Sequence, residues 1–163
     1  EVRIVNDEVW LRAASMAQGY WRNGQLMPLV NAEGWFATRD RGVLKDGKLT
    51  IVGRMDNLFF SGGEGIQPEE VERVIAAHPH VLQAFIVPIE DKEFGHRPVA
   101  VVEYDANAGE TNLAEWVKDK LARFQQPVCW LTLPPELKAG GIKISRRALS
   151  DWVSASSLTL RKH

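Results

Sequence analysis

A lysine lies between two isoleucines near the C-terminal end of the sequence, in KAGGIKISRRAL at residues 138–149. If these three residues are extended, successive side chains alternate between faces. Ile142 and Ile144 can then anchor in a core while Lys143 points the other way. The pattern therefore predicts a lysine ammonium that is presented from a fixed, strand-like segment.

A helix is predicted directly after this lysine. Ser145 is a good N-cap residue. Arg146 and Arg147 follow in the first turn, where their charges oppose the helix dipole at a cost of about 0.3–1 kcal/mol each. Three cations near a helix N-terminus suit an anionic ligand such as a phosphate. An ordinary surface lysine beside a solvated arginine pair explains the same residues, and this stretch alone leaves both interpretations open.

A glycine-rich loop forms a second candidate site in SGGEGIQPEE, and it consists of Gly62, Gly63, Glu64 and Gly65. It lacks the lysine and the hydroxyl residue of a P-loop phosphate cradle. Glu69 and Glu70 also place two negative charges in the first turn of the next helix, and these outweigh a dipole end worth about half a positive charge. The glycines instead permit positive φ and close backbone approach. The loop is either a structural turn or a place where a slender ligand passes.

Composition excludes several classes of protein. The chain has 163 residues, of which 45% are apolar, so it can bury a core and is not intrinsically disordered. A net charge of −1 with interspersed signs argues against a nucleic-acid surface. No apolar stretch approaches the length of a membrane span. The single cysteine, Cys129, indicates a reducing compartment, so we expect a cytoplasmic protein. The four histidines have no metal-ligand spacing, and no metal site is predicted.

The predicted strands and helices around these residues fall into two groups, with a boundary near Asp56. Residues 1–55 contain short β-rich segments, including a hairpin in VLKDGKLTIVG whose Asp46-Gly47 suits a tight turn. The sequence begins within a strand pattern and without methionine, so we expect it to be cut from a larger protein. Residues 1–55 are therefore predicted to be the strand-rich end of a large domain that is otherwise missing.

Residues 56–163 are predicted to form a small α+β domain. A helix starts at Pro68, and VLQAFIVPI, RPVAVVEY and VCWLTL are buried strands. Asn112 and Glu115 form a capping box for a helix. The inward face of that helix is predicted to be Leu113, Trp116, Val117, Leu121 and Phe124. The predicted fold is a short β-hairpin and a three-stranded sheet packed by helices.

Four segments, in order, resemble the C-terminal end of the adenylate-forming enzymes, the acyl-CoA synthetase and luciferase superfamily. They are GYW with GWFATRD, then GRMDNLFFSGGEGIQPEEVE, then HPHVLQAFIVPIEDKEFGHRPVAVVEY, and finally GIKISRRAL. The resemblance covers about residues 10–153. SGGEGIQPEEVERVIAAHP and FGHRPVAV are most similar to the o-succinylbenzoate–CoA ligase family of menaquinone biosynthesis.

This resemblance implies an AMP-forming, ATP-dependent acyl-CoA ligase. A small-molecule carboxylate, here o-succinylbenzoate, attacks the α-phosphate of ATP, and CoA then displaces AMP from the acyl-adenylate. The implied partners are the carboxylate, ATP, CoA and the missing N-terminal domain of the same enzyme. That domain is also expected to supply the Mg²⁺ ligand. We therefore expect this chain to be inactive by itself.

The resemblance also assigns roles to individual residues. Asp40 matches the acid that holds the ribose hydroxyls, and a carboxylate can accept several hydrogen bonds at once. Arg54 matches a second nucleotide contact and Asp56 matches the hinge about which the small domain swings. Lys143 matches the lysine of the adenylation step, a compact cation that stabilises developing charge. The loop 62–65 matches the segment that lines the pantetheine passage.

Some positions depart from the family pattern. Arg39 stands where the family usually has glycine, and Phe59-Phe60 stand where many members carry a lysine. One extra residue separates glycine from lysine in GIK. Arg146 and Arg147 keep two interpretations, one at a domain interface or a CoA phosphate and the other simple solvation.

Two alternative functions remain open. An adenylation domain could load the phosphopantetheine of a carrier protein, because that group presents the same thiol arm as CoA. A non-catalytic α+β module could bind a partner through a tryptophan-rich surface, since the chain has six tryptophans.

Overall fold

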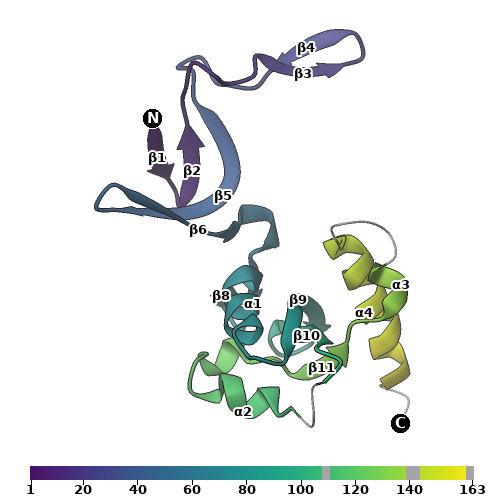
Figure 1. Ribbon diagram of the computed structural model, residues 1–163. Coiled ribbons are helices and arrows are strands. Elements are labelled where there is room, and N and C mark those ends of the chain that lie inside the picture. Colours follow the sequence, from purple (N-terminus) through teal and green to yellow (C-terminus); the bar gives the residue numbers. More distant parts are fainter. Residues whose placement is uncertain (108–110, 139–143, 161–163) are drawn as a thin grey trace. The chain divides into compact units, whose positions relative to one another are not determined.

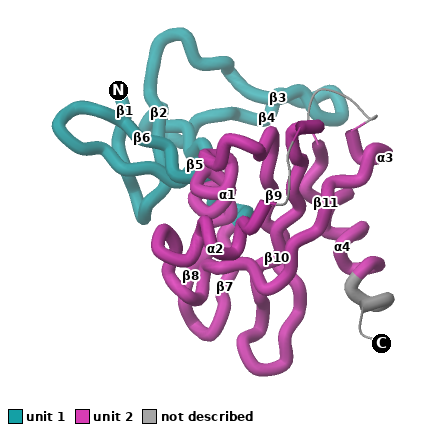
Figure 2. The backbone as a smooth tube through the Cα atoms, turned by 60° about the horizontal axis from the view of Figure 1, so that its bottom comes forward, with its two compact units in different colours: residues 1–57 teal, residues 58–163 magenta. Residues whose placement is uncertain are grey.

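The computed structural model describes residues 1–107, 111–138 and 144–160, with only the helical backbone for 157–160. It divides the chain into two compact units, residues 1–57 and 58–163 (Figure 2). Asp56 is the last residue but one of unit 1. Its role as a hinge stays a prediction.

Unit 1 consists of strands and one short 3-10 helix (Figure 1). The elements are β1 Val2–Val5, β2 Glu8–Leu11, β3 Gly19–Arg22, β4 Gln25–Pro28, β5 Phe36–Lys45, β6 Lys48–Arg54 and η1 Met55–Asn57. Strands β1, β2, β5 and β6 form an antiparallel sheet in this order, and β3 pairs with β4 in a separate hairpin. Asp46 and Gly47 join β5 to β6 with φ of 51° and 73°. Both values are positive, as a type I′ turn requires, so the predicted hairpin is confirmed.

The pairing of β5 with β6 brings together two residues that the sequence places 14 positions apart. Asp40 lies directly opposite Arg54 in the register. A bulge between Arg41 and Gly42 shifts the register next to this pair. Gly42 is needed there because a Cβ atom would lie 2.5 Å from Cγ2 of the buried Val9.

Unit 2 is an α+β unit, as predicted (Figure 1). Its elements are β7 Phe59–Ser61, β8 Glu64–Ile66, α1 Pro68–Ala76, β9 Val81–Asp91, β10 Gly95–Tyr104, α2 Leu113–Lys118, η2 Arg123–Gln125, β11 Cys129–Thr132, α3 Pro135–Lys138 and α4 Arg146–Leu160. Strand β10 pairs antiparallel with β9 and parallel with β11. These strands form the predicted three-stranded sheet. The β7–β8 hairpin joins β10 through Gly95 and Ser61, so the sheet has five strands.

Strand β10 is buried on both faces, which explains its continuous run of apolar residues. Ala100 and Val102 belong to a core that also contains residues of α1 and α2. Val99 and Val101 belong to a second core that contains residues of α4. Successive side chains of a strand alternate between faces, so β10 contributes to both cores with a period of two. Both cores therefore depend on this strand.

The predicted helix after Asn112 is shorter than expected. The side chain of Asn112 accepts a hydrogen bond from the backbone N–H of Glu115 at 3.1 Å, which confirms the N-cap. However, α2 ends at Lys118, so a continuous helix through Phe124 is wrong. Ala122 has φ −59° and ψ 151°, and this extended backbone separates α2 from the 3-10 helix η2. Leu121 and Phe124 still pack against the first core, so their helical spacing comes from two separate elements.

His78 packs against Trp116 beside the first core. The two rings meet edge to face with centroids 4.9 Å apart. The indole N–H donates to the carbonyl of Val74 at 2.9 Å, and the Lys120 ammonium lies 3.8 Å from the ring centroid. Burial lowers the pKa of His78, and the charges of His80 and Lys120 lower it further. The fold therefore favours the neutral imidazole.

We predict that stability decreases in mild acid through His78. The pKa of His78 is lower in the fold than the unfolded value of about 6.5. The contribution of the neutral His78 to the stability of the fold is therefore fully present above the unfolded pKa. It is lost as the pH falls through the folded pKa. Chemical denaturation of the chain at about pH 8 and pH 5 checks this. The difference in the free energy of unfolding between the two pH values should be smaller in His78→Gln than in the wild-type chain. If His78→Gln and the wild-type chain lost the same amount of stability between about pH 8 and pH 5, the prediction would be contradicted.

Candidate functional site

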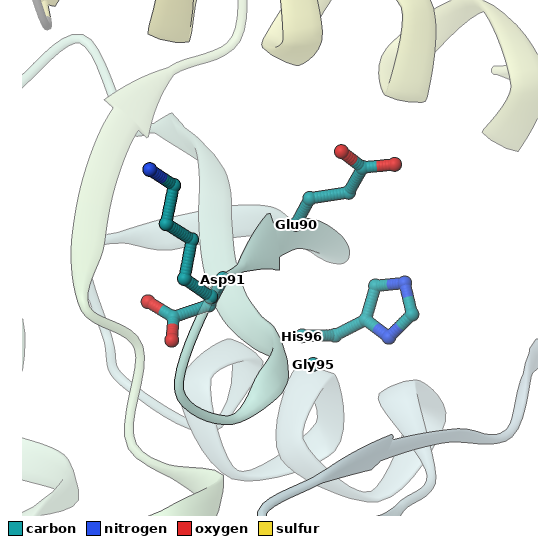
Figure 3. Close-up of a pocket in the computed structure, with 5 residues that line it drawn as sticks. Glu90, Asp91, Gly95 and His96 are labelled. Carbon is teal, nitrogen blue, oxygen red and sulfur yellow. The ribbon is translucent and has the colours of Figure 1, made fainter.

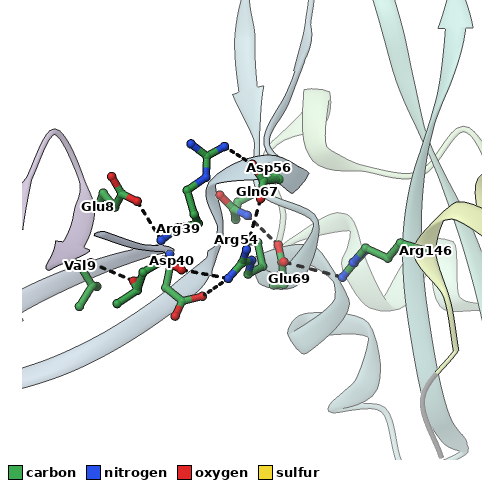
Figure 4. Close-up of polar contacts among 10 residues, drawn as sticks. Glu8, Val9, Arg39, Asp40, Arg54, Asp56, Gln67, Glu69 and Arg146 are labelled. Carbon is green, nitrogen blue, oxygen red and sulfur yellow. Dashed lines mark hydrogen bonds and ion pairs between the residues drawn. The ribbon is translucent and has the colours of Figure 1, made fainter. Parts of the chain in front are cut away.

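Four charged side chains of unit 1 lie together at the end of the β5–β6 pair that is away from its turn (Figure 4). They are Arg39, Asp40, Arg54 and Asp56. Nη1 of Arg54 donates to Oδ1 of Asp40 at 3.2 Å, and Nη2 donates to Oδ2 of Asp56 at 3.3 Å. Nη2 of Arg39 pairs with Oδ1, the other oxygen of Asp56. The structure thus brings together all three predicted site residues of this unit.

Backbone contacts fix the orientation of Asp40. Its N–H donates to Oγ1 of Thr38 at 3.0 Å, and that hydroxyl donates to the carbonyl of Val9 at 2.8 Å. Arg54 also donates to the carbonyl of Thr38 at 3.1 Å. A carboxylate has about four acceptor positions, and Oδ1 of Asp40 uses one of them for Arg54. Asp40 is therefore held in place while it keeps the capacity to accept further hydroxyl groups. Its contact with a nucleotide stays a prediction.

Asp56 is ionised at neutral pH. The hydrogen bond from Arg39 lowers the pKa of Asp56 below its usual range, and slight burial only partly opposes this. The charge of Arg39 and the hydrogen bond from Arg54 lower it further. The same bond raises the pKa of Arg39. This pairing stabilises the fold at neutral pH and is lost as the pH falls through the folded pKa of Asp56.

Arg39 has a backbone conformation that normally favours glycine. Its φ is 64°, in the left-handed region where a side chain is strained. This value explains why a glycine is suited to the position, as the family resemblance indicates. The N–H of Arg39 donates to Oε1 of Glu8 at 2.8 Å, which helps to hold the conformation.

The glycine loop is a tight turn between β7 and β8. Gly62 and Gly63 have φ of 58° and 86°, and Ser61 pairs with Glu64 on either side of them. The N–H of Gly62 donates to the carbonyl of Phe94 at 2.8 Å. A Cβ atom on Gly62 would lie 3.0 Å from the Phe94 ring. The structural interpretation of the loop is therefore confirmed, and its contact with pantetheine stays a prediction.

Lys143 lies outside the described residues, as does Ile142. The described chain resumes at Ile144, which packs against the second core. Oγ of Ser145 accepts a hydrogen bond from the N–H of Ala148 at 3.3 Å, so the predicted N-cap of α4 is confirmed. The residue that follows Lys143 is thus anchored by apolar packing.

Arg146 binds within unit 2 and is not simply solvated. Its Nη1 and Nη2 donate to the two carboxylate oxygens of Glu72 at 2.8 Å each, and Glu69 lies 3.8 Å away. Burial lowers the pKa of Arg146, but the hydrogen bonds and charge of Glu72 outweigh it and raise the pKa overall. Neither interpretation from the sequence included this pairing. Glu72 was missed because it lies 74 residues away in the chain.

We predict that Arg146 and Arg147 contribute differently to stability. Arg146→Gln should lower the free energy of unfolding by about 1.5–3 kcal/mol, because it removes charge-assisted hydrogen bonds. Arg147 is exposed on the same turn of α4, so Arg147→Gln should change stability by less than about 0.5 kcal/mol. Denaturant unfolding of the two variants checks this. Equal free energies of unfolding for the two variants would show that the Arg146–Glu72 pair does not stabilise the fold.

A depression of 370 Å³ lies on the β9–β10 hairpin and is lined by Glu90, Asp91, Lys92, Gly95 and His96 (Figure 3). Glu90 and His96 are opposite each other in the register. None of the residues predicted from the sequence to form a site lines it. Within the described ranges, no group of three or more His, Cys, Asp or Glu side chains could hold a metal ion. Those ranges also contain no helix with the length and hydropathy needed to cross a membrane.

Comparison with known proteins confirms the family resemblance. Residues 70–134 match the AMP-binding enzyme C-terminal domain. The chain is 80% identical over 153 residues to 2-succinylbenzoate–CoA ligase of Salmonella typhimurium, an alignment that covers 94% of this chain and 34% of the relative. The chain therefore spans about a third of the length of the relatives it matches.

Solved structures agree with this result. A variant of Escherichia coli MenE with bound OSB-AMS has a TM-score of 0.87 and 78% identity, covering 96% of this chain and 34% of that one. The o-succinylbenzoate CoA synthetase (MenE) of Bacillus subtilis, solved with the acyl-adenylate OSB-AMP, has a TM-score of 0.76 and 28% identity. That match covers 93% of this chain and 34% of the Bacillus chain. The α+β fold of unit 2 is thus confirmed.

Proposed function

We propose that this chain, whose residues 70–134 belong to the AMP-binding enzyme C-terminal domain family, is the C-terminal portion of an AMP-forming acyl-CoA ligase that acts on 2-succinylbenzoate. The observation that carries the proposal is the 80% identity to a 2-succinylbenzoate–CoA ligase across 94% of the chain. The acyl-binding pocket lies in the part of the enzyme that this chain does not cover.

In the first half-reaction, a carboxylate oxygen of the substrate forms a bond to the α-phosphorus of ATP. The bond from that phosphorus to the pyrophosphate oxygen breaks, and pyrophosphate leaves with the electron pair. Asp40 accepts hydrogen bonds from the ribose hydroxyls. Arg54 holds the Asp40 carboxylate at 3.2 Å and so keeps it aimed at the nucleotide. Lys143 stabilises the charge that develops on the oxygens around the α-phosphorus.

In the second half-reaction, the thiol sulfur of CoA attacks the acyl carbon. The carbon–sulfur bond forms, the bond to the AMP oxygen breaks, AMP leaves with the electron pair, and the thiol proton passes to water. Between the two steps the small domain turns about Asp56 and withdraws Lys143. The turn at Gly62 and Gly63 then lines the passage of the pantetheine arm, where the absence of side chains permits a close approach.

The proposal also includes the metal ion and the cellular compartment of the reaction. ATP carries Mg²⁺, and we assign the Mg²⁺ ligand to the part of the enzyme that this chain does not cover. Cys129 is a free thiol, which suits action in the reducing cytoplasm.

Lys143→Ala in the full-length ligase tests the proposal. Pyrophosphate release from ATP and 2-succinylbenzoate should fall about 100- to 1,000-fold, because a preorganised cation is lost from the transition state. CoA transfer from pre-formed acyl-adenylate should stay near wild type. Lys118→Ala, on the exposed surface of α2, is the control and should spare both steps. If adenylation survives in Lys143→Ala, the role of this lysine is refuted.

The 163-residue chain alone should form no acyl-CoA, because it covers about a third of the ligases it matches. The measurement is thioester formation from ATP, 2-succinylbenzoate and CoA by the purified chain. Full-length ligase at the same concentration is the positive control. Turnover by the isolated chain would contradict the proposed division of the site.

A further inference from the structure

The exposed side chain of Arg39 sits on a strained backbone. Its φ of 64° is unfavourable for any residue that has a Cβ atom. Strained backbone of this kind persists where other contacts hold it, and it is frequent at functional positions. The contact made by the side chain of Arg39 is the pair with Asp56. A glycine at this position would remove the strain and would also remove that contact.

Asp56 is held from two sides. Arg39, on β5, engages Oδ1, and Arg54, at the end of β6, engages Oδ2 at 3.3 Å. Arg39 is itself tied to β2, because its backbone N–H donates to Glu8 at 2.8 Å. Asp56 lies in η1, at the end of unit 1. Two neighbouring strands of the sheet therefore restrain the segment at the end of this unit.

We propose that Arg39 is a positioning residue that restrains the segment Met55–Asn57 by holding Asp56, and so affects the balance between the two half-reactions. The inference rests on the proposed function, in which this segment is the hinge. Arg39 acts through Asp56 and touches no reacting atom. The family-typical glycine could not provide this restraint.

The solvent exposure of the Arg39–Asp56 ion pair limits the strength of the restraint. The side chains of Arg39 and Asp56 are 61% and 48% exposed. Exposed ion pairs are weak and change an equilibrium by at most about five-fold. They are also screened by salt. A restraint of this strength adjusts a conformational equilibrium without locking it, which suits a segment that must move in each catalytic cycle.

The experiment compares four forms of the full-length ligase, the wild type and three variants. Arg39→Gly removes the side chain and relieves the backbone, so it should fold. Arg39→Lys keeps a cation that can reach one oxygen of Asp56. Arg41→Gln is the matched control, because it removes a different exposed pair of β5, that of Arg41 with Asp7 at 3.5 Å. Amide hydrogen exchange of the peptide that contains Met55–Asn57 is measured in each form at low and high salt.

We expect Arg39→Gly to speed exchange in this peptide about two- to five-fold at low salt, and less at high salt. Arg39→Lys and Arg41→Gln should stay close to wild type. The ratio of the adenylation rate to the thioester-forming rate should shift in Arg39→Gly and in neither of the others. Unchanged exchange in Arg39→Gly would overturn the inference.

Loss of adenylation in Arg39→Gly with unchanged exchange would also overturn it, because Arg39 would then contact the nucleotide directly. The proposed function is tested separately by the wild-type enzyme. If the wild type formed no acyl-adenylate from 2-succinylbenzoate, the function would fail, whereas the exchange comparison would still decide whether Arg39 holds Asp56.

Discussion

The hydrogen bonds to the carboxylate of Glu72 hold three elements of unit 2 together. The carboxylate accepts two hydrogen bonds from Arg146 at 2.8 Å each, and it also accepts the backbone N–H of Ile86 at 2.8 Å. One side chain of α1 therefore binds strand β9 and the first residue of α4. Because Glu72 is mostly buried, with 14% of its side chain exposed, an unpaired charge here would be costly. The charge of Arg146, which is unfavourable at a helix N-terminus, is balanced by this acid.

Apolar packing reinforces the same arrangement. Strand β10 supplies side chains to cores on both of its faces, and α4 covers one of them through Leu149 and Val153. Ile144 joins that core directly after Lys143 in the sequence. The helix, the ion pair and the core therefore fix the chain immediately after the proposed catalytic lysine. In the proposed mechanism the lysine enters and leaves a site with the small domain, and such a rigid base would help to position it.

In unit 1 the pairing register of two strands, β5 and β6, positions the charged side chains. Asp40 and Arg54 face each other only because the β5–β6 turn has two residues and the bulge lies next to Arg41. A shift of the register by one residue would place their side chains on opposite faces. The bulge also requires glycine at position 42, because the strand there approaches Val9 too closely for a Cβ atom. The geometry of the backbone thus determines the positions of Asp40 and Arg54, the charged residues of the proposed nucleotide contact.

Local sequence patterns correctly predicted the α+β class, the Asp46-Gly47 hairpin, the start of α1 at Pro68 and the caps at Asn112 and Ser145. They could do so because turn chemistry, capping and strand alternation are local. The ordered motifs also indicated the family and the residues Asp40, Arg54 and Asp56. Three features became apparent only in the folded chain: the end of α2 at Lys118, the pairing of Arg146 with Glu72 and the contact of Arg39 with Asp56. Each of these depends on packing or on charges between segments far apart in the chain, and one sequence contains no local signal for such pairs.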